Sequence, residues 1–415
     1  MNRGRAGGRA ARAPWALSSV DLVVTPACNL RCAYCYQAVR RPGRMPWPVA
    51  KASLVRLLDS RSRLRQVCMT GGEPLLAAPL VRRIVRFVRT HEPARRRLRV
   101  DVISNGTLLD DRLAAFLAMH GVGLQISMDG VMAAQALRGA WTYARLDALL
   151  ERLGSRQPRW FRRRVSVAIT LTPATVPHLA ESFAYLLSKD VREISVAPAL
   201  GAARGWRRAR MAELDREFGR VFSASLAHRR RTGRVPLTLF RKTVEDQAHP
   251  SQPLCGITGG SKIVVDADGR VYGCHPAIPS FMTRPSPLLE KVAAAMSLGG
   301  ISDLDPEDAL PAFREALDAT GLFGPRGRLV SSLGACRSCA YLGRCAVCPL
   351  SIAYAPGARN PRRVPGFACA FSRTALKYRD RFPPRAPSSP DGPPADLLKR
   401  LDRALRLAPG PRTTS

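Results

Sequence analysis

Three cysteines, Cys28, Cys32 and Cys35, lie in one short loop with the spacing C-x3-C-x2-C. Such a loop supplies three thiolates but no fourth, so a four-iron cluster held there would keep one iron open to another ligand. An open iron can bind and activate a small molecule. The spacing therefore predicts a site that performs chemistry.

A structural zinc site or a disulfide is the alternative for this triplet. Structural zinc prefers four ligands in a tetrahedral arrangement, and no histidine is near enough in the sequence to be the obvious fourth. The Arg-rich start also lacks the apolar stretch of a signal peptide, and without one the 11 cysteines are more plausible as metal ligands than as disulfides. The iron-sulfur interpretation is favoured.

A second group of cysteines occupies the last part of the chain: Cys255, Cys274, Cys336, Cys339, Cys345, Cys348 and Cys369. Seven thiolates exceed one site, and zinc ribbons place about 15 to 20 residues between their C-x2-C halves. Here the spacing is C-x2-C-x5-C-x2-C. Two zinc sites stay open as an alternative, but two iron-sulfur clusters, one with four cysteines and one with three, fit better.

The elements that must position these cysteines follow from the apolar pattern. Strand-like runs alternate with amphipathic stretches, which predicts βα units around a parallel sheet. The expected strands are Val20–Thr25, Gln66–Thr70, Leu98–Ser104, Val122–Ser127, Val165–Leu171 and Glu193–Ala197, and the expected helices are Pro48–Asp59, Ala78–Arg89, Asp110–His120, Thr142–Leu153 and Val176–Ser188. The predicted fold class is α/β, a partial (β/α)6 barrel with a small cysteine-rich C-terminal domain.

Beyond the barrel we expect an exposed helix in the Arg-rich stretch Gly201–Arg234, with Met211–Ala227 at its centre. A hairpin of Lys262–Val265 and Arg270–Tyr272 would carry Cys274 back toward Cys255, because the Asp-Ala-Asp-Gly run between the two segments is a turn signal. The long segment from Pro276 to Ala335 should contain a helix over Asp305–Asp318.

Polar motifs follow several of the expected strands. They are Gly71, Gly72, Glu73 and Pro74 after the second strand, Ser104 and Asn105 after the third, and Ser127 and Asp129, with Arg138 further on, after the fourth. Ligands of parallel barrels bind at the carboxyl ends of the strands. We therefore expect these residues to share one face with the cysteine loop.

The cysteine triplet, with an aromatic residue before its last cysteine, resembles the signature of the radical S-adenosylmethionine (radical SAM) enzymes. By that resemblance, the open iron of a [4Fe-4S] cluster chelates the methionine moiety of SAM, whose cleavage gives a 5′-deoxyadenosyl radical. Gly71 to Pro74 would then cradle the methionine amino group. Ser104, Asn105, Ser127, Asp129 and Arg138 would contact the rest of the cofactor.

The second cysteine group resembles the SPASM extension of radical SAM enzymes, which holds two auxiliary [4Fe-4S] clusters. The resemblance implies that Cys336, Cys339, Cys345 and Cys369 hold the distal cluster, and that Cys255, Cys274 and Cys348 hold the proximal one. This sequence lacks the eighth cysteine that some relatives carry soon after the position of Cys255. The proximal cluster is therefore a candidate for a second open iron.

His275 stands where sulfatase-maturating relatives have an aspartate that is a proton acceptor. A general base in catalysis is one interpretation of His275, and a structural histidine is the other. Cys68 lies inside a strand and is expected to be a small buried hydrophobe. The five histidines other than His275 show no metal-like spacing.

Composition limits the remaining possibilities. The chain has 415 residues and 46% apolar residues, which suits one large and one small domain. No apolar run reaches the length of a membrane span, so a cytoplasmic protein is expected.

The net charge of +35 is carried mostly by arginines spread along the chain. Among them are Arg162–Arg164, which are expected at solvated helix ends or loops. Codon bias explains this spread better than nucleic-acid binding does, and an acidic peptide partner stays open.

The expected division is a basic tail over 1–18, a radical SAM core over 19–235, an auxiliary-cluster domain over 236–382 and a Pro-rich tail over 383–415. The last tail has a possible short helix, Pro393–Leu407.

We expect an enzyme that modifies side chains of a ribosomally made peptide, by crosslink, thioether or oxidation. Expected partners are the precursor peptide, an electron donor of flavodoxin or ferredoxin type and, optionally, a separate leader-recognition protein. The rivals are a radical SAM enzyme for a small molecule such as a sugar nucleotide, and a zinc-containing nucleic-acid-binding protein.

Overall fold

The computed structural model describes most of the chain between residues 16 and 383. The described ranges are 16–37, 41–92, 98–201, 206–241, 260–282, 286–323, 330–331, 333–345, 347–355 and 358–383. The predicted tail over 1–18 and the Pro-rich tail over 383–415, with its possible helix Pro393–Leu407, lie almost wholly outside these residues.

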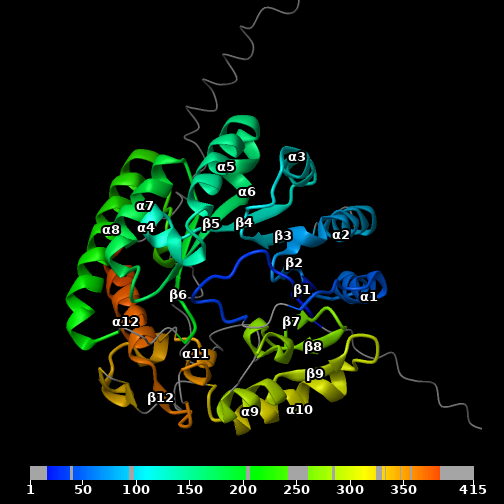
Figure 1. Ribbon diagram of the computed structural model, residues 1–415. Coiled ribbons are helices and arrows are strands. Elements are labelled where there is room, and N and C mark those ends of the chain that lie inside the picture. The colour runs from blue at the N-terminus through cyan, green and yellow to red at the C-terminus, as the bar shows by residue number, and fades with distance from the viewer. Residues whose placement is uncertain are drawn as a thin grey trace, which may run out of the picture.

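Six parallel strands form the central part of the molecule (Figure 1). Neighbours in the sequence are neighbours in the sheet, in the order β6-β5-β4-β3-β2-β1. The strands are β1 (Ser19–Thr25), β2 (Gln66–Gly71), β3 (Arg99–Ser104), β4 (Gly123–Ser127), β5 (Val165–Leu171) and β6 (Ile194–Pro198). The prediction of a partial six-stranded α/β barrel is confirmed.

Helices follow each of these strands, and the longer ones lie on the outside of the curved sheet (Figure 1). They are α1 (Trp47–Leu58), α2 (Ala78–His91), α3 (Asp111–Met119), α4 (Met132–Gln135), α5 (Thr142–Arg156), α6 (Pro158–Arg164), α7 (Leu179–Ser188) and α8 (Met211–Thr232). The sequence analysis missed α4 and α6. Both are short, and α6 has only one turn's worth of apolar side chains, Trp160 and Phe161, to reveal a helical period.

The strands point small and polar side chains to the inside of the barrel at every second position. In β2, Gln66, Cys68 and Thr70 line cavities, whereas Val67 and Met69 are fully buried in the core between sheet and helices. This alternation follows from the two-residue period of a strand. The inside of the barrel is therefore lined by groups that can bind ligands.

Three more strands extend the sheet on the free side of β1: β7 (Lys262–Val265), β8 (Arg270–Tyr272) and β9 (Ser297–Gly300). The expected hairpin is confirmed, since β7 and β8 pair antiparallel. The pairing of β7 with β1, parallel and from Ser19↔Lys262 onward, was not expected. The segment after the barrel thus continues the same sheet of nine strands.

The remaining C-terminal elements lie against this extension and against α8. They are α9 (Pro287–Ala295), α10 (Pro306–Ala319), β10 (Val330–Ser331), β11 (Gly334–Ala335), α11 (Pro349–Ala353), β12 (Arg363–Val364) and α12 (Gly366–Arg381). The expected helix over Asp305–Asp318 is α10, whereas α9 and α12 were missed. In α12, Lys377 Nζ is 2.6 Å from an Asp215 carboxylate oxygen on α8, which fixes the two helices side by side (Figure 1).

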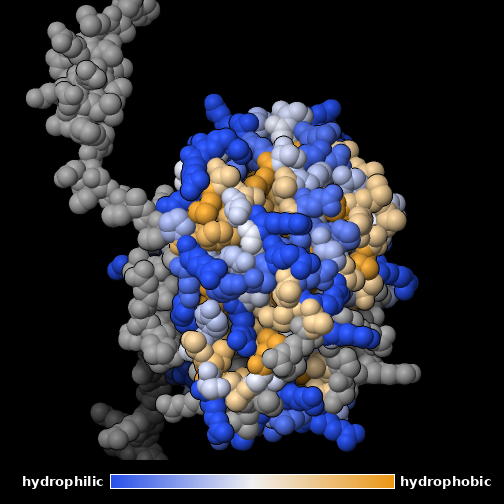
Figure 2. Space-filling view, turned by 90° about the vertical axis from the view of Figure 1, so that its left-hand side faces the viewer, coloured by the Kyte–Doolittle hydropathy of each residue, from blue (hydrophilic) through white to orange (hydrophobic). Residues whose placement is uncertain are grey.

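Figure 2 shows hydrophilic side chains spread over one face among small apolar areas, without a continuous stripe. No helix within the described ranges is long and apolar enough to cross a membrane. The domain boundaries predicted near residues 18, 235 and 382 stay predictions.

Candidate functional site

A cavity of about 300 Å³ opens at the carboxyl ends of the barrel strands. Three parts of the chain line it together: the cysteine loop, the turn after β2 and the ends of β3 to β6. The lining includes Cys28, Cys32, Tyr34, Cys35, Tyr36, Gln37, Thr70, Gly71, Gly72, Ser104, Asn105, Ser127, Arg138 and Thr170. The expectation that these motifs share one face is met by the geometry.

The three thiols of the loop face this cavity as one group. Burial raises the pKa of the Cys32 thiol, the positive charge of Arg138 opposes this rise, and the neighbouring Cys35 and Cys28 add to it. Within the parts of the chain that the structure describes, no group of three or more Cys, His, Asp or Glu side chains is drawn together as a closed metal site. Three soft thiolates on one loop are nevertheless the donor set that iron-sulfur clusters use.

Two glycines bring the turn after β2 against the cysteine loop. A Cβ at Gly71 would lie 2.1 Å from the Thr25 carbonyl oxygen, and a Cβ at Gly72 would lie 2.2 Å from that of Ala27. The close approach allows the Gly72 N–H to donate to Thr25 O at 2.9 Å and the Glu73 N–H to donate to Ala27 O at 2.8 Å. Any larger side chain would separate the two segments.

Glu73 is fully buried and does not line the cavity. Its carboxylate accepts from the Ser104 hydroxyl at 2.8 Å, from the Asn105 N–H at 2.7 Å and from the Leu75 N–H at 2.9 Å. Burial raises the pKa of the Glu73 carboxyl, and these hydrogen bonds oppose the rise. Glu73 joins the ends of β2 and β3, and its predicted contact with SAM stays a prediction. Pro74 begins the 3-10 turn that follows and is also buried.

The loop after β3 is tied to the cysteine loop by amide groups. The Asn105 amide donates to Asn29 Oδ1 at 2.8 Å, and the Asn29 amide donates to Thr107 Oγ1 at 2.9 Å. Asn105 thus lines the cavity and also positions the loop that carries the thiols.

Asp129 organises the other wall of the cavity. Its carboxylate receives two hydrogen bonds of 3.0 Å from the Arg138 guanidinium, one from the Thr170 N–H at 2.9 Å and one from the Tyr34 hydroxyl. Asp129 and Arg138 are 1% and 8% exposed, so the pair is buried. The predicted cofactor residue Arg138 faces the cavity, whereas Asp129 lies behind it and holds it in place.

Sequence reasoning missed several residues of this site. Gln37 donates its amide to Gly71 O at 2.9 Å, and the Arg138 guanidinium donates to Thr170 Oγ1 at 3.2 Å. Tyr34 was noted only as the aromatic residue before Cys35. Gln37 and Tyr34 lie in or next to the cysteine motif, and this position was the only signal in the sequence. Their hydrogen-bond partners belong to other βα units, which the motif does not reveal.

Four of the later cysteines form a second group. Cys336, Cys339, Cys345 and Cys369 line one small cavity between the segment 333–345 and α12. The Cys369 thiol donates to Ser331 Oγ at 3.2 Å. The four residues expected to share the distal cluster are thus together in space.

The proximal set is only partly described. Cys255 lies outside the described residues, Cys274 follows β8, and Cys348 is the residue before α11. The Tyr354 hydroxyl at the end of α11 donates to Pro276 O at 2.6 Å, so the segments that carry Cys274 and Cys348 are joined. Their shared role as ligands stays a prediction.

His275 does not line the main cavity. Its Nδ1 is 3.5 Å from Asp21 Oδ2, which also contacts Lys262 Nζ at 2.7 Å, and its buried Nε2 has no hydrogen-bond partner among the described residues. Burial lowers the pKa of His275, Asp21 opposes this, and Lys262 adds to it. The geometry places the imidazole beside β1, and a role as general base stays a prediction.

Comparisons with known proteins agree with this geometry. The Radical SAM superfamily model matches residues 22–183. A cysteine-type anaerobic sulfatase-maturating enzyme of Clostridium perfringens is 23% identical over 278 residues, or 61% of this chain and 74% of the relative. A probable GTP 3′,8-cyclase of Methanopyrus kandleri is 34% identical over 114 residues, or 27% of this chain and 34% of the relative.

The fold agrees over most of the chain with a solved structure, native anSMEcpe with bound AdoMet. The TM-score is 0.65 at 19% identity, and the match covers 88% of this chain and 97% of the other. It extends well beyond the residues of the family model, into the C-terminal elements. With the cysteine loop and the strand-end motifs in one cavity, these findings confirm the resemblance: residues 22–183 form a domain of the Radical SAM superfamily.

Proposed function

We propose that this enzyme modifies side chains of a ribosomally made peptide, with SAM at the main cavity and a SPASM-type cysteine region beside it. The bond formed is a thioether, a carbon-carbon or carbon-oxygen crosslink, or an oxidised side chain. Support for a peptide substrate comes from the sulfatase-maturating relative, whose name describes action on another protein.

In this proposal Cys28, Cys32 and Cys35 would hold a [4Fe-4S] cluster. With SAM bound, such a cluster would supply the radical chemistry that removes a hydrogen atom from the substrate. The protein's own part is to orient SAM, through the glycine turn, Ser104, Asn105, Ser127 and Arg138, and to exclude water. Arg138, held in place by Asp129, supplies a fixed positive charge for a carboxylate.

The distal auxiliary cluster is assigned to the four thiols that share the small cavity, Cys336, Cys339, Cys345 and Cys369. The proximal cluster is assigned to Cys255, Cys274 and Cys348. Three protein thiolates would leave one iron of that cluster for a soft ligand such as a substrate thiolate.

The observation that carries the proposal is the shared cavity of about 300 Å³, in which three thiols of one loop face polar groups from four strand ends. A zinc-containing nucleic-acid-binding protein would need neither the close glycine turn nor the buried Asp129–Arg138 pair. For a small-molecule substrate, the GTP 3′,8-cyclase likeness is the supporting observation, but it covers only 27% of this chain. The peptide proposal draws on a longer match.

The direct experiment incubates the anaerobically reconstituted enzyme with SAM, a reductant and each short peptide found to be encoded beside its gene. We expect formation of 5′-deoxyadenosine together with a peptide whose mass has changed, by the loss of two hydrogen atoms for a thioether or crosslink. An enzyme that cleaves SAM but leaves the peptide unchanged, while it converts a nucleotide or sugar nucleotide, would contradict the peptide substrate.

The proposal includes an external electron donor of flavodoxin or ferredoxin type and, optionally, a separate protein that recognises a leader sequence. Both are tested by whether peptide turnover rises when the corresponding protein is added. The cytoplasmic location expected from the sequence stays a prediction.

A further inference from the structure

A second cavity, of about 400 Å³, lies at the amino ends of the barrel strands, opposite the cysteine loop. Its inner wall carries Gln66, Cys68, Asp101, Gln125 and Ser166, which are inward-facing positions of β2 to β5. The main cavity lies at the other ends of the same strands, and Ile103 lines both. Nothing in the proposed radical chemistry uses this second cavity.

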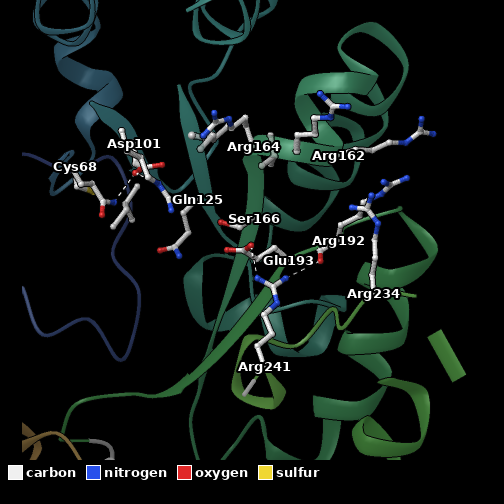
Figure 3. A pocket seen from close by; sticks show the side chains of 17 residues that line it. Cys68, Asp101, Gln125, Arg162, Arg164, Ser166, Arg192, Glu193, Arg234 and Arg241 are labelled. Atoms are coloured by element: carbon white, nitrogen blue, oxygen red, sulfur yellow. Dashed lines mark hydrogen bonds and ion pairs between the residues drawn. The ribbon is translucent and has the colours of Figure 1, made fainter. Parts of the chain in front are cut away.

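The rim of this cavity is strongly basic. Seven arginines line it: Arg99, Arg162, Arg163, Arg164, Arg192, Arg234 and Arg241. Only two carboxylates, Asp101 and Glu193, are in the lining with them. The arginines come from β3, from the end of α6 and from the segments flanking β6 and following α8, so the fold gathers charges that are scattered in the sequence (Figure 3).

Some of these guanidinium groups are held in fixed positions. Asp190 contacts Arg162 Nε at 2.6 Å and Arg192 Nε at 3.2 Å, and it does so from a left-handed backbone conformation with φ 55°, which costs free energy for a residue other than glycine. Arg241 contacts Glu193 at 2.8 Å and donates to Val235 O at 3.1 Å. These contacts orient the side chains before any ligand binds.

Other guanidinium groups on the rim are available to a ligand. Arg163, Arg164 and Arg234 are exposed, and no ion pair or side-chain hydrogen bond is found for them among the described residues. The side of the cavity toward β6 therefore has a positive potential that its own carboxylates do not cancel.

The inner wall limits where an anion can bind. The Asp101 carboxylate already accepts from the Gln66 amide at 2.6 Å and from Arg99 Nε at 2.7 Å, and it would repel an anion from the β2–β3 side. Gln125 and Ser166 lie between Asp101 and the arginines (Figure 3), and their side chains can donate hydrogen bonds. The Glu193 carboxylate lies near Ser166 and is paired with Arg241 (Figure 3). An anion would thus lie toward Arg163, Arg164 and Arg234, whose guanidinium groups are exposed.

We propose that this cavity binds a small anion that carries two or more phosphoryl groups. Guanidinium groups bind phosphate oxygens with paired, charge-assisted hydrogen bonds, and a volume of about 400 Å³ is in the range of small-molecule sites. A nucleic-acid duplex or an extended acidic peptide would need a long groove or stripe, whereas these arginines border a single cavity. The ligand binds apart from SAM and the substrate peptide.

The test measures binding of inorganic pyrophosphate to the full-length enzyme by isothermal titration calorimetry in low salt. We expect saturable binding at one site per chain, weakened by added salt because the arginines are exposed. The double variant Arg164→Gln/Arg234→Gln should bind about tenfold more weakly or worse, since two charge-assisted hydrogen-bonding groups are lost.

The matched control is Arg112→Gln/Arg216→Gln, which removes two exposed arginines on α3 and α8 that do not line the cavity. It should bind pyrophosphate within about twofold of the wild type, because neither arginine lines the cavity and neither can hydrogen-bond an anion there. A second variant, Ser166→Asp, adds a negative charge to the inner wall without removing an arginine and should also abolish binding. All variants should still cleave SAM.

Three results would overturn the proposal. One is the absence of saturable pyrophosphate binding to the wild type in low salt. Another is an equal loss in the control variant, which would mean that net charge alone attracts the anion. The third is tight binding of a hexaglutamate peptide that pyrophosphate does not displace, which would assign the arginines to an acidic peptide.

Discussion

Charged side chains are buried and paired at the carboxyl ends of the barrel strands, whereas at the amino ends many of them are exposed and most are positive. At the carboxyl ends, Glu73, Asp129 and Arg138 are 0%, 1% and 8% exposed, and each is bonded to specific neighbours. At the amino ends, Arg162, Arg164 and Arg234 are exposed, and the seven arginines that line the cavity outnumber its two carboxylates. Burial requires a partner for every charge, whereas water tolerates a surplus of one sign. The site at the carboxyl ends therefore holds its charged groups in fixed positions, whereas the cavity at the amino ends attracts anions.

Removal of a buried charge partner should have the largest effect on stability. Arg138→Ala leaves the Asp129 carboxylate buried without its ion pair, which typically costs about 3–5 kcal/mol. The free energy of unfolding, measured by urea denaturation, should fall by this amount. The control is Arg210→Ala, which removes a helical ion pair with Glu213 worth about 0.2–0.5 kcal/mol. Equal losses in the two variants would show that burial of the pair is unimportant.

Loss of Glu73 should have the next largest effect, seen in cofactor binding. Glu73→Ala removes hydrogen bonds that position Ser104 and Asn105, and, if the carboxylate meets the SAM ammonium, a contact of about 1.5–3 kcal/mol. The dissociation constant for SAM should rise about tenfold to a hundredfold. The conservative variant Glu73→Gln separates the two roles, because it keeps the shape but not the charge. Unchanged SAM binding in Glu73→Ala would mean that Glu73 only shapes the turn.

Disturbing the close backbone contact between the turn after β2 and the cysteine loop should have an effect of intermediate size on stability and on SAM binding. Gly72→Ala forces a Cβ to within 2.2 Å of Ala27 O, and overpacking of this kind costs about 1–3 kcal/mol. Both thermal stability and SAM binding should fall. At Gly343, where a Cβ would meet nothing within 4 Å, the same change should be tolerated, so comparable losses at both positions would speak against the steric argument.

The exposed arginines should give the smallest effect. Arg164→Gln removes a charge that has no partner among the described residues, and surface changes of this kind stay within about 0.5 kcal/mol. The free energy of unfolding should be unchanged or slightly increased in low salt, because repulsion between like charges is relieved. A loss as large as that of Arg138→Ala would erase the contrast between the two ends of the barrel.

The sequence predicted the strands and most helices well because their signals are local. Alternating apolar residues and helical periods lie within each element, and β5 was predicted at its observed bounds, Val165–Leu171. The pairing of β7 with β1 could not be predicted in this way. It joins residues more than 200 positions apart, such as Ser19 and Lys262, and a short strand carries no information about such a partner.

In the candidate site, too, local motifs could be predicted and contacts between distant parts of the chain could not. Residue types and spacing identified the thiols, the glycine turn and Arg138, because each lies in a recognisable motif. They did not reveal that Asp129 holds both Tyr34 and Arg138, which depends on distances between separate βα units. The basic cavity was also hidden, since Arg162–Arg164 in isolation resemble any solvated helix end.

The most direct test of the central claim is SAM cleavage by the anaerobically reconstituted protein, measured as 5′-deoxyadenosine formed with a strong reductant. We predict cleavage by the wild type, about twelve irons per chain for three clusters of four, and loss of both cleavage and about four irons in the triple variant Cys28→Ala/Cys32→Ala/Cys35→Ala. Cleavage retained by the triple variant, or stoichiometric zinc in place of iron in the wild type, would contradict the assignment.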